Sequence, residues 1–346
     1  MYFKMMGLFF GLVILNCLLF INLKKLSNFI NVFDKPDNIL KKHTATVPLL
    51  GGTILAINFS LIILFIFIFD YKFPYKEIFL KKYTSIFFFI FSFFILGIID
   101  DKYKLKPDKR FFLSILLSII VLTLNKDLII SDVKFSFYEN RLFLNNYSYF
   151  FTIFCIMILI NALNFYDGVN GQSILFFLIT FSYIAYNSPI YVFYILIILV
   201  LIFILFLNLR GKTFMGDNGI YFLGSILIIS LIYEHNIFKS IKYADQIFLL
   251  LILPGYDLLR LTFTRIYKGK NAFYGDRNHI HHLLINRFSL SKTNIILTLL
   301  AILPIFLFSF IGINFFVVLT IFTFIYFLLI LKLSKNDKKY YFWKKK

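Results

Sequence analysis

The sequence predicts an all-α integral membrane protein that crosses a bilayer many times. Three observations lead to this fold class: 60% of the residues are hydrophobic, only 15% are charged, and the mean hydropathy is +0.84. An ordinary soluble domain carries about 25% charged residues. A composition this poor in charge therefore excludes a soluble enzyme or a soluble binding module.

We expect about eleven transmembrane helices, because a spanning helix needs roughly 20 mostly apolar residues. Runs of this kind lie near 5–23, 48–69, 83–99, 111–124, 149–166, 172–187, 190–207, 220–233, 246–263, 293–311 and 314–331. The runs 111–124 and 172–187 are short, so a tilted or partly inserted helix is the alternative for each. No internal repeat or linker divides the chain, so residues 1–346 are expected to form one membrane domain with a basic tail from about 332 to 346.

The distribution of basic residues predicts the orientation. Of the 36 Lys and Arg residues, 26 lie in the odd-numbered connections and the C-terminal tail, and 10 lie in the N-terminus and the even-numbered connections. Basic residues concentrate on the cytoplasmic side of membrane proteins. We therefore expect the N-terminus outside and the C-terminus in the cytoplasm. The net charge of +19 then follows from topology and from attraction to anionic lipid headgroups, so binding to nucleic acid is not needed to explain it.

The first apolar run and the two cysteines carry no further signal. The run follows only Lys4 and precedes no small-residue cleavage site, so we interpret it as a retained anchor. Cys17 and Cys155 lie inside apolar runs, and neither a disulfide nor a zinc site of cysteines is expected.

Polar residues gather in five connections that are all expected on the cytoplasmic side. These are "DKPDNILKKHTATVPLLGG" (34–52), "GIIDDKYKLKPDKR" (97–110), "NALNFYDGVNG" (161–171), "NLRGKTFMGDNG" (208–219) and "RIYKGKNAFYGDRNHIHHLL" (265–284). Five connections that face one aqueous side can converge on a single site.

Carboxylates stand at the ends of two apolar runs. Adjacent helical residues point about 100° apart, so Asp100 and Asp101 are expected to do different work, one holding a metal and the other facing a substrate phosphate. Asp217 lies between two glycines, which allow a backbone to approach a ligand closely, and nearby Phe214 offers a ring on which a flat base could stack. The alternatives are an ordinary helix end in water for the aspartate pair and a tight turn for Asp217.

Amides and one carboxylate recur every third residue in the fifth connection. Asn161, Asn164 and Asp167 fall within one arc of a helix that leads into the turn around Asn170. Amide bonds between membrane helices, ended by a glycine cap, are the structural alternative. Amides together with a carboxylate and two turn glycines exceed what a cap requires, which favours a binding site.

Three of the five histidines lie in the ninth connection, and their spacing places His279 and His282 on one helix face. Zinc binding, a pH-dependent structural cluster and anion binding are the competing interpretations. The surrounding basic residues suit a multiply charged anion such as a phosphate, whereas a solvated basic loop would need no ligand. The residues concerned are Arg265, Lys268, Lys270, Arg277, His279, His281 and His282.

Carboxylates and basic groups in one site point to a shared cation. Mg²⁺ takes oxygen ligands, usually one or two carboxylates together with substrate phosphates, so we expect Mg²⁺ here with Mn²⁺ as a substitute. Phosphoryl transfer depends on positioning and on neutralisation of charge. A site at the inner surface of the membrane can meet a soluble nucleotide and a lipid phosphate, which predicts transfer of a phosphate-bearing group onto a lipid carrier. A transporter or flippase of anionic lipid-linked sugars and a catalytically inactive scaffold subunit are the alternatives.

The ordered motifs "DxP…H…P..GG", "DDK", "NALNFYDGVNG", "FMGDNG", "P..D..R" and "R…GK..F..DRNHIHHLL" resemble those of a known family over about residues 34–284. The family is that of the bacterial polyprenyl-phosphate N-acetylhexosamine-1-phosphate transferases, relatives of phospho-N-acetylmuramoyl-pentapeptide transferase within glycosyltransferase family 4. The resemblance implies Mg²⁺-dependent transfer of a sugar-1-phosphate from a UDP-N-acetylhexosamine to undecaprenyl phosphate, which releases UMP. It also implies a bacterial inner membrane enzyme that faces the cytoplasm and initiates an envelope glycan, of the O-antigen, teichoic acid or capsule type. A homodimer through outward-facing helices is compatible with it.

The resemblance also implies roles for individual residues. Asp217 would be the main metal ligand, with Asp100 and Asp101 assisting the metal and orienting the lipid phosphate. The nucleotide would contact Asn161, Asn164, Asp167 and Asn170, and uracil would stack on Phe214. The pyrophosphate or the sugar would be held by Arg277, His279, His281 and His282, while His43 would line the lipid phosphate or the rim of the metal site.

The sequence departs from the family pattern at three places. The family usually has Asp where Asn170 stands, which affects the expected uracil contact, although an amide can also pair with a uracil edge. The connection before Phe214 is about one residue shorter than usual, and Ile220 replaces a common Ser. The "HIHH" motif fits the simple N-acetylhexosamine branch better than the muramoyl-pentapeptide branch.

Overall fold

The fold is all-α, as the composition predicts. The computed structural model describes residues 2–34, 46–68, 76–271 and 277–343. The helices are α1 (Tyr2–Ile21), α2 (Leu23–Ile30), α3 (Gly51–Ile68), α4 (Lys76–Tyr103), α5 (Pro107–Leu124), α6 (Ser148–Tyr166), α7 (Gln172–Asn187), α8 (Tyr191–Leu209), α9 (Gly216–Asn236), α10 (Ala244–Leu250), α11 (Ile252–Tyr267), α12 (Ile280–Ile285), α13 (Leu290–Ser309) and α14 (Phe315–Trp343). Two short antiparallel pairs, β1 (Phe33–Asp34) with β2 (Val47–Pro48) and β3 (Asp132–Val133) with β4 (Leu142–Phe143), close connections outside the helices.

The helices identify a multi-pass membrane protein. Within the described ranges, six helices are long and apolar enough to cross a membrane, or up to eight if each bent pair counts as one span. Two shorter apolar helices add to these, at Gly51–Phe65 and Gln172–Asn187. Each apolar run named from the sequence coincides with a helix or with a bent pair. The total of eleven spans and the sides of the two termini stay predictions.

One apolar run, 246–263, is sharply bent, and the first run ends at a second bend. Helices α1 and α2 meet at 72°, and α10 and α11 meet at 74°. Pro254 lies in the first turn of α11. Proline lacks a backbone N–H, which would break a hydrogen bond inside a continuous helix, but the first N–H groups of a helix have no partner within it. Proline therefore favours the start of a new helix at this point over continuation of α10. The run expected as one span at 246–263 is therefore two helices, and α11 turns toward the loop that carries the histidines.

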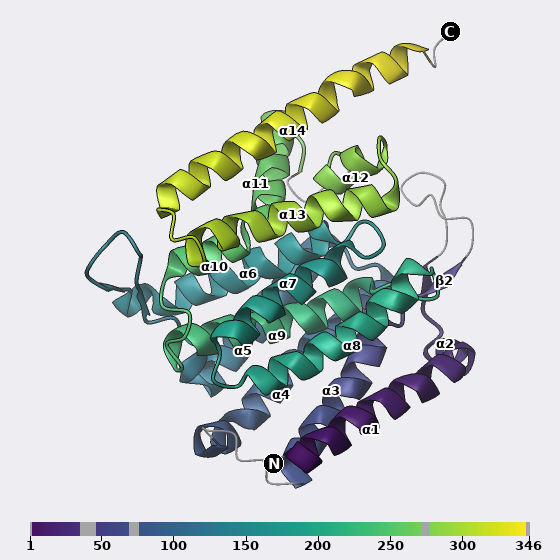
Figure 1. Cartoon of the computed structure of the whole chain (residues 1–346), viewed down its shortest axis with the longest axis vertical. Coiled ribbons are helices and arrows are strands. Elements are labelled where there is room, and N and C mark those ends of the chain that lie inside the picture. Colours follow the sequence, from purple (N-terminus) through teal and green to yellow (C-terminus); the bar gives the residue numbers. More distant parts are fainter. Residues whose placement is uncertain (1, 35–45, 69–75, 272–276, 344–346) are drawn as a thin grey trace.

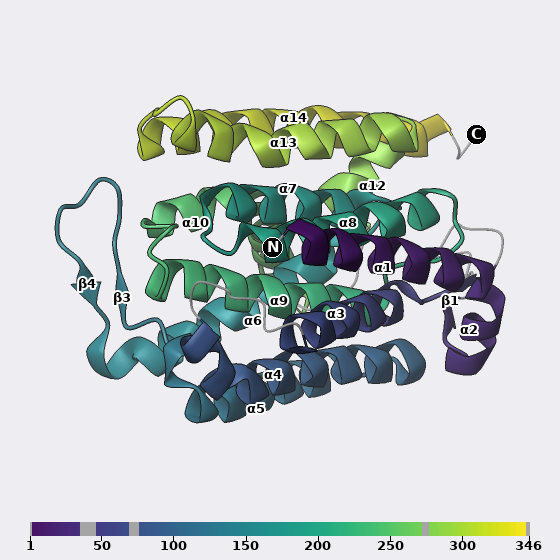
Figure 2. The same ribbon diagram turned by 60° about the horizontal axis from the view of Figure 1, so that its bottom comes forward.

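Helix α9 forms the centre of the bundle, with α3, α4, α6 and α7 packed around it (Figures 1 and 2). In its most apolar window 89% is buried, more than in any other candidate span of the described chain. Glycines allow the closest approaches to its first turn. A Cβ at Gly97 of α4 would lie 2.4 Å from Asn218 Cα, and one at Gly52 of α3 would lie 2.5 Å from Gly219 N. Small residues that let backbones approach are typical of helix packing in membranes.

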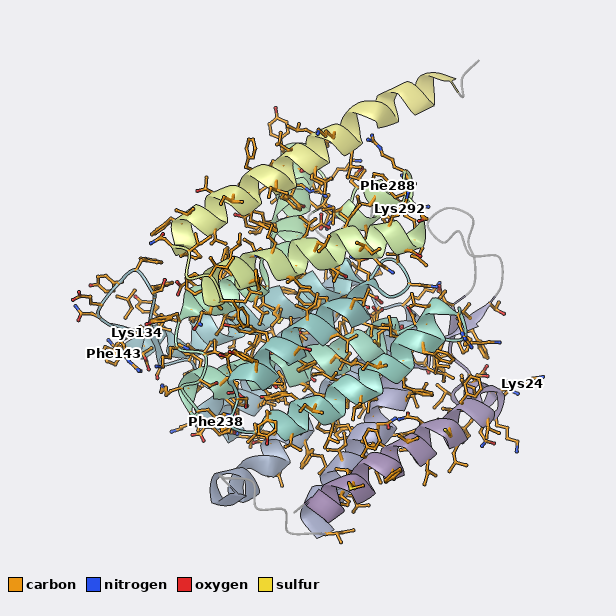
Figure 3. All side chains as sticks on the ribbon, in the orientation of Figure 1. Lys24, Lys134, Phe143, Phe238, Phe288 and Lys292 are labelled. Carbon is orange, nitrogen blue, oxygen red and sulfur yellow. The ribbon has the colours of Figure 1, made fainter. Side chains whose placement is uncertain are left out.

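The connections lie at two opposite ends of the bundle. Figure 3 shows Lys24 and Lys292 at one end, and Lys134, Phe143 and Phe238 at the other. The first two belong to connections expected in the cytoplasm, and the other three belong to connections expected outside. The structure thus separates the two predicted sets of connections, and the assignment of one end to the cytoplasm stays a prediction.

The packing against α9 predicts that Gly97→Ala destabilises the fold. The new methyl group would collide with the backbone of α9, which cannot move aside as a flexible side chain can. We expect a loss of about 1 to 3 kcal/mol, measured as a lower melting temperature of the purified protein. Gly255→Ala in α11 is the matched control, because a Cβ there meets nothing within 4 Å. Equal melting temperatures for the two variants would contradict the close packing.

Candidate active site

Five chain segments meet at one end of the bundle and enclose a cavity of about 750 Å³. Its lining residues come from the two sides of the β1–β2 pair, the end of α4, the α6–α7 turn, the α8–α9 connection and the α12–α13 region. These are the five connections in which the sequence concentrates its polar residues. Their convergence on one site was expected from the sequence.

The predicted site residues divide into three groups. Those that line the cavity are Asp101, Asn164, Asp167, Asn170, Phe214, Asp217, Arg277 and His282. Those that lie outside its lining are Asp100, Asn161, His279 and His281. His43 lies outside the described residues.

Asp101 holds the beginning of α9. Its two carboxylate oxygens accept hydrogen bonds from the backbone of Asp217 (N to Oδ1, 2.9 Å) and of Asn218 (N to Oδ2, 3.0 Å), and the Asn218 side chain adds a third at 2.6 Å. The first amides of a helix have no partner within the helix, and a carboxylate satisfies them and complements the helix dipole. Gly216, at φ 72°, supplies the left-handed turn that brings the chain into α9. Asp101 of α4 thus fixes the position of Asp217.

Asp100 points into a separate, buried ion pair. Its Oδ2 lies 3.1 Å from Arg110 Nη1 of α5, and its Oδ1 accepts a hydrogen bond from Leu105 N at 3.0 Å. The hydroxyl of Tyr221 donates to Oδ2 at 3.5 Å and accepts from Asn164 Nδ2 at 3.0 Å. The adjacent aspartates therefore take different partners, and the hydrogen bonds of Tyr221 and Asn164 connect Asp100 to the cavity lining.

The Asp217 carboxylate accepts no hydrogen bond from the described residues. Its charged neighbours include Asp101 and Asp167 as well as Arg110. No group of three or more His, Cys, Asp or Glu side chains within the described ranges forms a complete metal site. Mg²⁺ commonly takes one or two carboxylates and completes its shell with water and substrate phosphates. Asp217, with Asp101 beside it, fits that pattern of donors.

The α6–α7 turn contributes amides and a second carboxylate. Asn164 bonds to Tyr221, and Asp167 Oδ1 accepts a hydrogen bond from Ser173 Oγ at 2.6 Å. Burial raises the pKa of Asp167 to about 6, and the Ser173 hydrogen bond opposes the rise. Asn161 lies deeper in α6 and bonds to Met157 O at 2.7 Å, which is the pattern of an ordinary membrane-helix amide.

Three features of the turn hold it in place. Asn170 O accepts a hydrogen bond from Asn294 Nδ2 of α13 at 2.9 Å. Gly171, at φ 86°, donates its N–H to Asn208 Oδ1. A Cβ at Gly168 would lie 1.8 Å from the Nε2 atom of His281, so only glycine fits beside that ring. The turn is therefore held by α8, by α13 and by residues 277–282, which carry the three clustered histidines and are called the histidine loop below.

The three clustered histidines face different partners. His282 lines the cavity, His281 is buried with its Nδ1 3.3 Å from Gln172 Nε2, and His279 Nδ1 lies 2.8 Å from Asp257 Oδ2. The expectation that His279 and His282 share a helix face is wrong. Helix α12 begins at Ile280, and His279 precedes it with an extended backbone because Asp257 binds both residues.

His281 is suited to a neutral, structural role. Burial lowers the pKa of its ring well below the usual value, and the neighbouring His282 and His279 lower it further. A neutral imidazole can pack against Gly168 and bond to Gln172 without a counter-ion.

Sequence reasoning missed three residues that the structure brings to the site. Arg110 was counted only as a topological charge, although it pairs with Asp100. Tyr221 and Asn218 lie in α9 one helical turn apart and bond to Asp100 and Asp101, respectively. Their only sequence signal is that polar side chains follow Asp217 in an otherwise apolar run.

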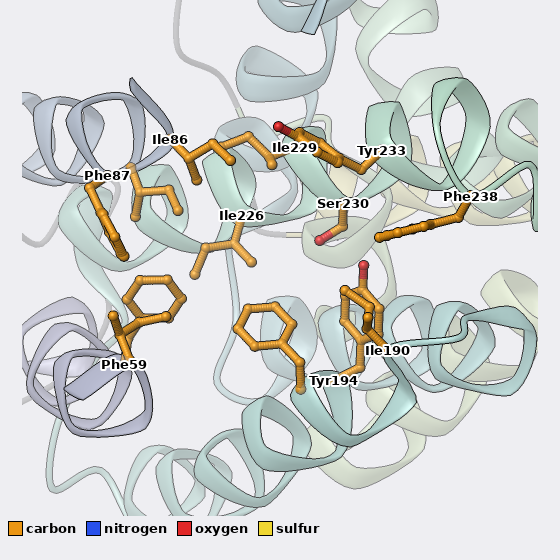
Figure 4. Close-up of a pocket in the computed structure, with 13 residues that line it drawn as sticks. Phe59, Ile86, Phe87, Ile190, Tyr194, Ile226, Ile229, Ser230, Tyr233 and Phe238 are labelled. Carbon is orange, nitrogen blue, oxygen red and sulfur yellow. The ribbon is translucent and has the colours of Figure 1, made fainter. Parts of the chain in front are cut away.

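A second cavity lies away from these polar residues, between α3, α4, α8 and α9 (Figure 4). It has a volume of about 50 Å³, and hydrocarbon side chains such as Phe59, Phe87 and Ile226 form most of its wall. Ser230, Tyr194 and Tyr233 contribute its hydroxyl groups. Among the described residues no carboxylate or basic side chain lines it, and the groups that line it are not those that phosphoryl chemistry requires.

Part of the chain is similar to a known family of glycosyl transferases. Residues 83–235 match the model of glycosyl transferase family 4. The undecaprenyl-phosphate alpha-N-acetylglucosaminyl 1-phosphate transferase of Escherichia coli (strain K12) is 27% identical over 291 residues, which cover 80% of this chain and 76% of that protein. The matched segment, which covers less than half of the chain, is similar to glycosyl transferase family 4. A probable undecaprenyl-phosphate N-acetylglucosaminyl 1-phosphate transferase of Bacillus subtilis (strain 168) is 29% identical over 76% of this chain and 72% of its own length.

The segment that matches the family 4 model contains much of the candidate site. It runs from α4 to α9 and includes Asp100, Asp101, Asp167 and Asp217 together with the α6–α7 turn. The histidine loop and helices α10 to α14 lie beyond it. Both parts meet at the cavity, because Arg277 and His282 line it with the matched residues.

The buried ion pair predicts that Arg110→Ala destabilises the protein. Removal of Arg110 leaves the Asp100 carboxylate, which is only 4% exposed, without its cation, and breaking a buried pair in this way costs about 3 to 5 kcal/mol. The melting temperature of purified protein is the measurement. The double variant Asp100→Asn with Arg110→Gln should recover much of the loss because no lone charge remains. A double variant that melts no higher than Arg110→Ala would show that the pair is not what stabilises this region.

Proposed function

We propose that this protein transfers a sugar-1-phosphate from a UDP-N-acetylhexosamine to undecaprenyl phosphate. A phosphate oxygen of the lipid attacks the β-phosphorus of the nucleotide sugar, and a new P–O bond forms. The bond between that phosphorus and the oxygen of the α-phosphate breaks, and UMP leaves with the electron pair. The product is undecaprenyl-pyrophosphoryl-sugar. A phosphate oxyanion is already a competent nucleophile, so direct attack needs no covalent enzyme intermediate.

The proposal rests on one observation: acidic and basic side chains line the large cavity together. Asp101, Asp167 and Asp217 share it with Arg277 and His282, and it opens at the helix ends of a membrane bundle. A site at that depth can be reached by a soluble nucleotide from the aqueous side and by a lipid phosphate from the bilayer. The names of the relatives in Escherichia coli and Bacillus subtilis contain undecaprenyl phosphate and an N-acetylglucosaminyl 1-phosphate group, which agree with the lipid acceptor and the transferred group of the proposal.

The lining residues divide naturally between the parts of the donor. Phe214, Asn164 and Asn170 would receive the uridine, with the Phe214 ring stacked on uracil. Arg277 and His282 would hold the pyrophosphate, since guanidinium and imidazole groups donate to phosphate oxygens. The cavity volume of about 750 Å³ is in the range of small-molecule and cofactor sites.

Mg²⁺ would be held by Asp217 with Asp101 beside it. The Asp217 carboxylate receives no hydrogen bond from the described residues, and it lies among other carboxylates. When bound, the metal would supply charge neutralisation for the donor phosphates and for the departing UMP. Asp101 would keep Asp217 in place by holding the first turn of α9, and Asp100 would act on the site through Tyr221.

The proposal includes a cellular setting. The basic end of the bundle would face the cytoplasm of a bacterium, at the inner membrane, where UDP-sugars are made. The product would be the first lipid-linked intermediate of an envelope glycan such as an O-antigen, a teichoic acid linkage unit or a capsule. N-acetylglucosamine is the first donor to test, because it is the sugar in the names of the relatives.

The test is UMP release by purified protein given undecaprenyl phosphate, Mg²⁺ and a panel of UDP-N-acetylhexosamines. We expect release that requires both lipid and metal, and a loss of about a hundredfold or more in Asp217→Asn, as for removal of a group that stabilises developing charge. Release without lipid would indicate simple hydrolysis of the donor. No release with any donor would count against the transferase and favour a transporter or an inactive scaffold.

The cavity geometry predicts that His282 and His281 differ in function. His282→Ala should raise the KM for the nucleotide sugar by about tenfold, the equivalent of one charge-assisted hydrogen bond, and should leave the melting temperature unchanged. His281→Ala should lower the melting temperature, because His281 is buried against Gly168 and Gln172. Steady-state kinetics and thermal unfolding of the two variants are the measurements. The opposite pattern would show that His281, not His282, meets the donor.

A further inference from the structure

One buried carboxylate joins three parts of the chain behind the histidine loop. Asp257 of α11 accepts hydrogen bonds at Oδ1 from Arg260 Nη2 (2.7 Å), the Tyr326 hydroxyl (3.0 Å) and Ile280 N (3.2 Å). Its Oδ2 lies 2.8 Å from His279 Nδ1. Asp257 is 2% exposed, so these contacts are formed away from water. The carboxylate therefore ties α11, the start of α12 and α14 together.

These contacts hold the beginning of α12. His279 caps this helix but gives no side-chain hydrogen bond to its amides, and Asp257 instead receives the Ile280 N–H. Arg260 Nη2 also donates to Asn278 O at 2.7 Å. Residues 278–280 are thus held by hydrogen bonds to the Asp257–Arg260 ion pair of α11. Arg277 and His282, which both line the cavity, lie on either side of these residues in the sequence.

The His279 ring has a partner at each nitrogen and is not part of the cavity lining. Because the Asp257 carboxylate can only accept, His279 Nδ1 carries the proton in this contact, and Nε2 faces the Arg265 guanidinium at 3.4 Å. The Phe165 ring lies beside both, 5.5 Å from the Arg265 guanidinium carbon and 5.8 Å from the His279 ring centre. His279 belongs to the support of the loop.

Tyr326 extends this support to the C-terminal helix. Its side chain is fully buried, and its hydroxyl donates to Asp257 Oδ1 while it accepts from Arg260 Nε at 3.0 Å. One hydroxyl therefore bridges both members of the ion pair and fixes their relative orientation. No residue of α14 lines the cavity within the described chain, so α14 acts on the site through its contacts with α11 and with the α12 region.

We propose that Tyr326 is a positioning residue for donor binding, which acts through Asp257 and Arg260 on the loop that carries Arg277 and His282. The inference rests on the proposed transferase function and adds the C-terminal helix to its donor site. Loss of the hydroxyl loosens the ion pair, and residues 277–282 then present their side chains to the donor in a wider range of positions. The KM for the nucleotide sugar rises, while the KM for the lipid phosphate stays the same.

The chain provides a matched control for this hydroxyl. Tyr256 of α11 bonds through its own hydroxyl to Thr323 Oγ1 of α14 at 2.9 Å. This contact joins the same two helices one turn away from Tyr326, and among the described residues the Tyr256 hydroxyl has no hydrogen bond to residues 277–282. Tyr326→Phe and Tyr256→Phe therefore remove the same atom between the same helices, and they differ in whether the loop is affected.

The experiment compares the two variants with the unaltered protein in the UMP-release assay. We expect Tyr326→Phe to raise the donor KM by about tenfold, with a smaller change in kcat and none in the lipid KM. Tyr256→Phe should change none of the three. Arg260→Lys, which keeps the charge but loses the forked contacts to Tyr326 and Asn278, should resemble Tyr326→Phe.

Amide hydrogen exchange of the peptide that contains Ile280 gives a readout that does not depend on activity. Tyr326→Phe should speed exchange there by about tenfold relative to the unaltered protein, and Tyr256→Phe should not. Equal effects of the two variants on the donor KM or on this exchange would overturn the proposal. So would a fall in melting temperature in Tyr326→Phe that accounts for its whole loss of activity, because a merely structural contact would act in that way.

The outcome also separates this inference from the proposed function. If the unaltered protein releases no UMP with any donor, the transferase proposal fails, whatever exchange shows at Ile280. If the unaltered protein is active and the two tyrosine variants behave alike, the transferase stands and the positioning role of Tyr326 fails.

Discussion

The site depends first on the contact between Asp101 and the beginning of α9. A helix that starts inside a membrane bundle has amides that neither water nor its own turns can satisfy. Asp101 satisfies them from a neighbouring helix, and its charge matches the positive end of the helix dipole. Gly97 and Gly52 make the contact close enough by allowing α4 and α3 to touch the first turn of α9. The carboxylate of Asp217 takes its position from this arrangement.

The buried acids of the bundle differ mainly in their partners. Glu234, at the other end of α9, accepts hydrogen bonds from the hydroxyls of Ser188, Tyr194 and Ser240 and is fully buried. Asp257 is neutralised by Arg260 and bonds to His279. Acids with complete sets of partners hold helices together. Asp217 receives no such donors from the described residues and faces a large cavity, so it retains the capacity to bind a cation or a substrate group.

The histidine loop shows how one short motif can serve two purposes. His282 reaches the cavity, while His279 and His281 are buried in contact with α11 and with the α6–α7 turn. A loop that binds a charged donor must be held in one position, since each side chain that is ordered on binding costs affinity. The two buried histidines and Asp257 hold the loop in one position before the donor binds. Tyr326 links Asp257 to α14, the last helix of the chain.

The sequence by itself determined the fold class, the positions of the apolar helices and the convergence of five polar connections. These follow from composition and from hydrophobic runs, which are local properties of the chain. It also selected Asp101, Asp167, Asp217 and His282, because polar residues at the ends of membrane helices are few and costly. Only the tertiary structure decided what each of these residues does. Asp100 and Asp101 are neighbours in sequence, yet one binds Arg110 and the other caps α9, because the orientation of α4 points them at different helices. The roles of Tyr221 and Tyr326 arise from contacts across more than 60 residues of chain, and no local pattern encodes such contacts.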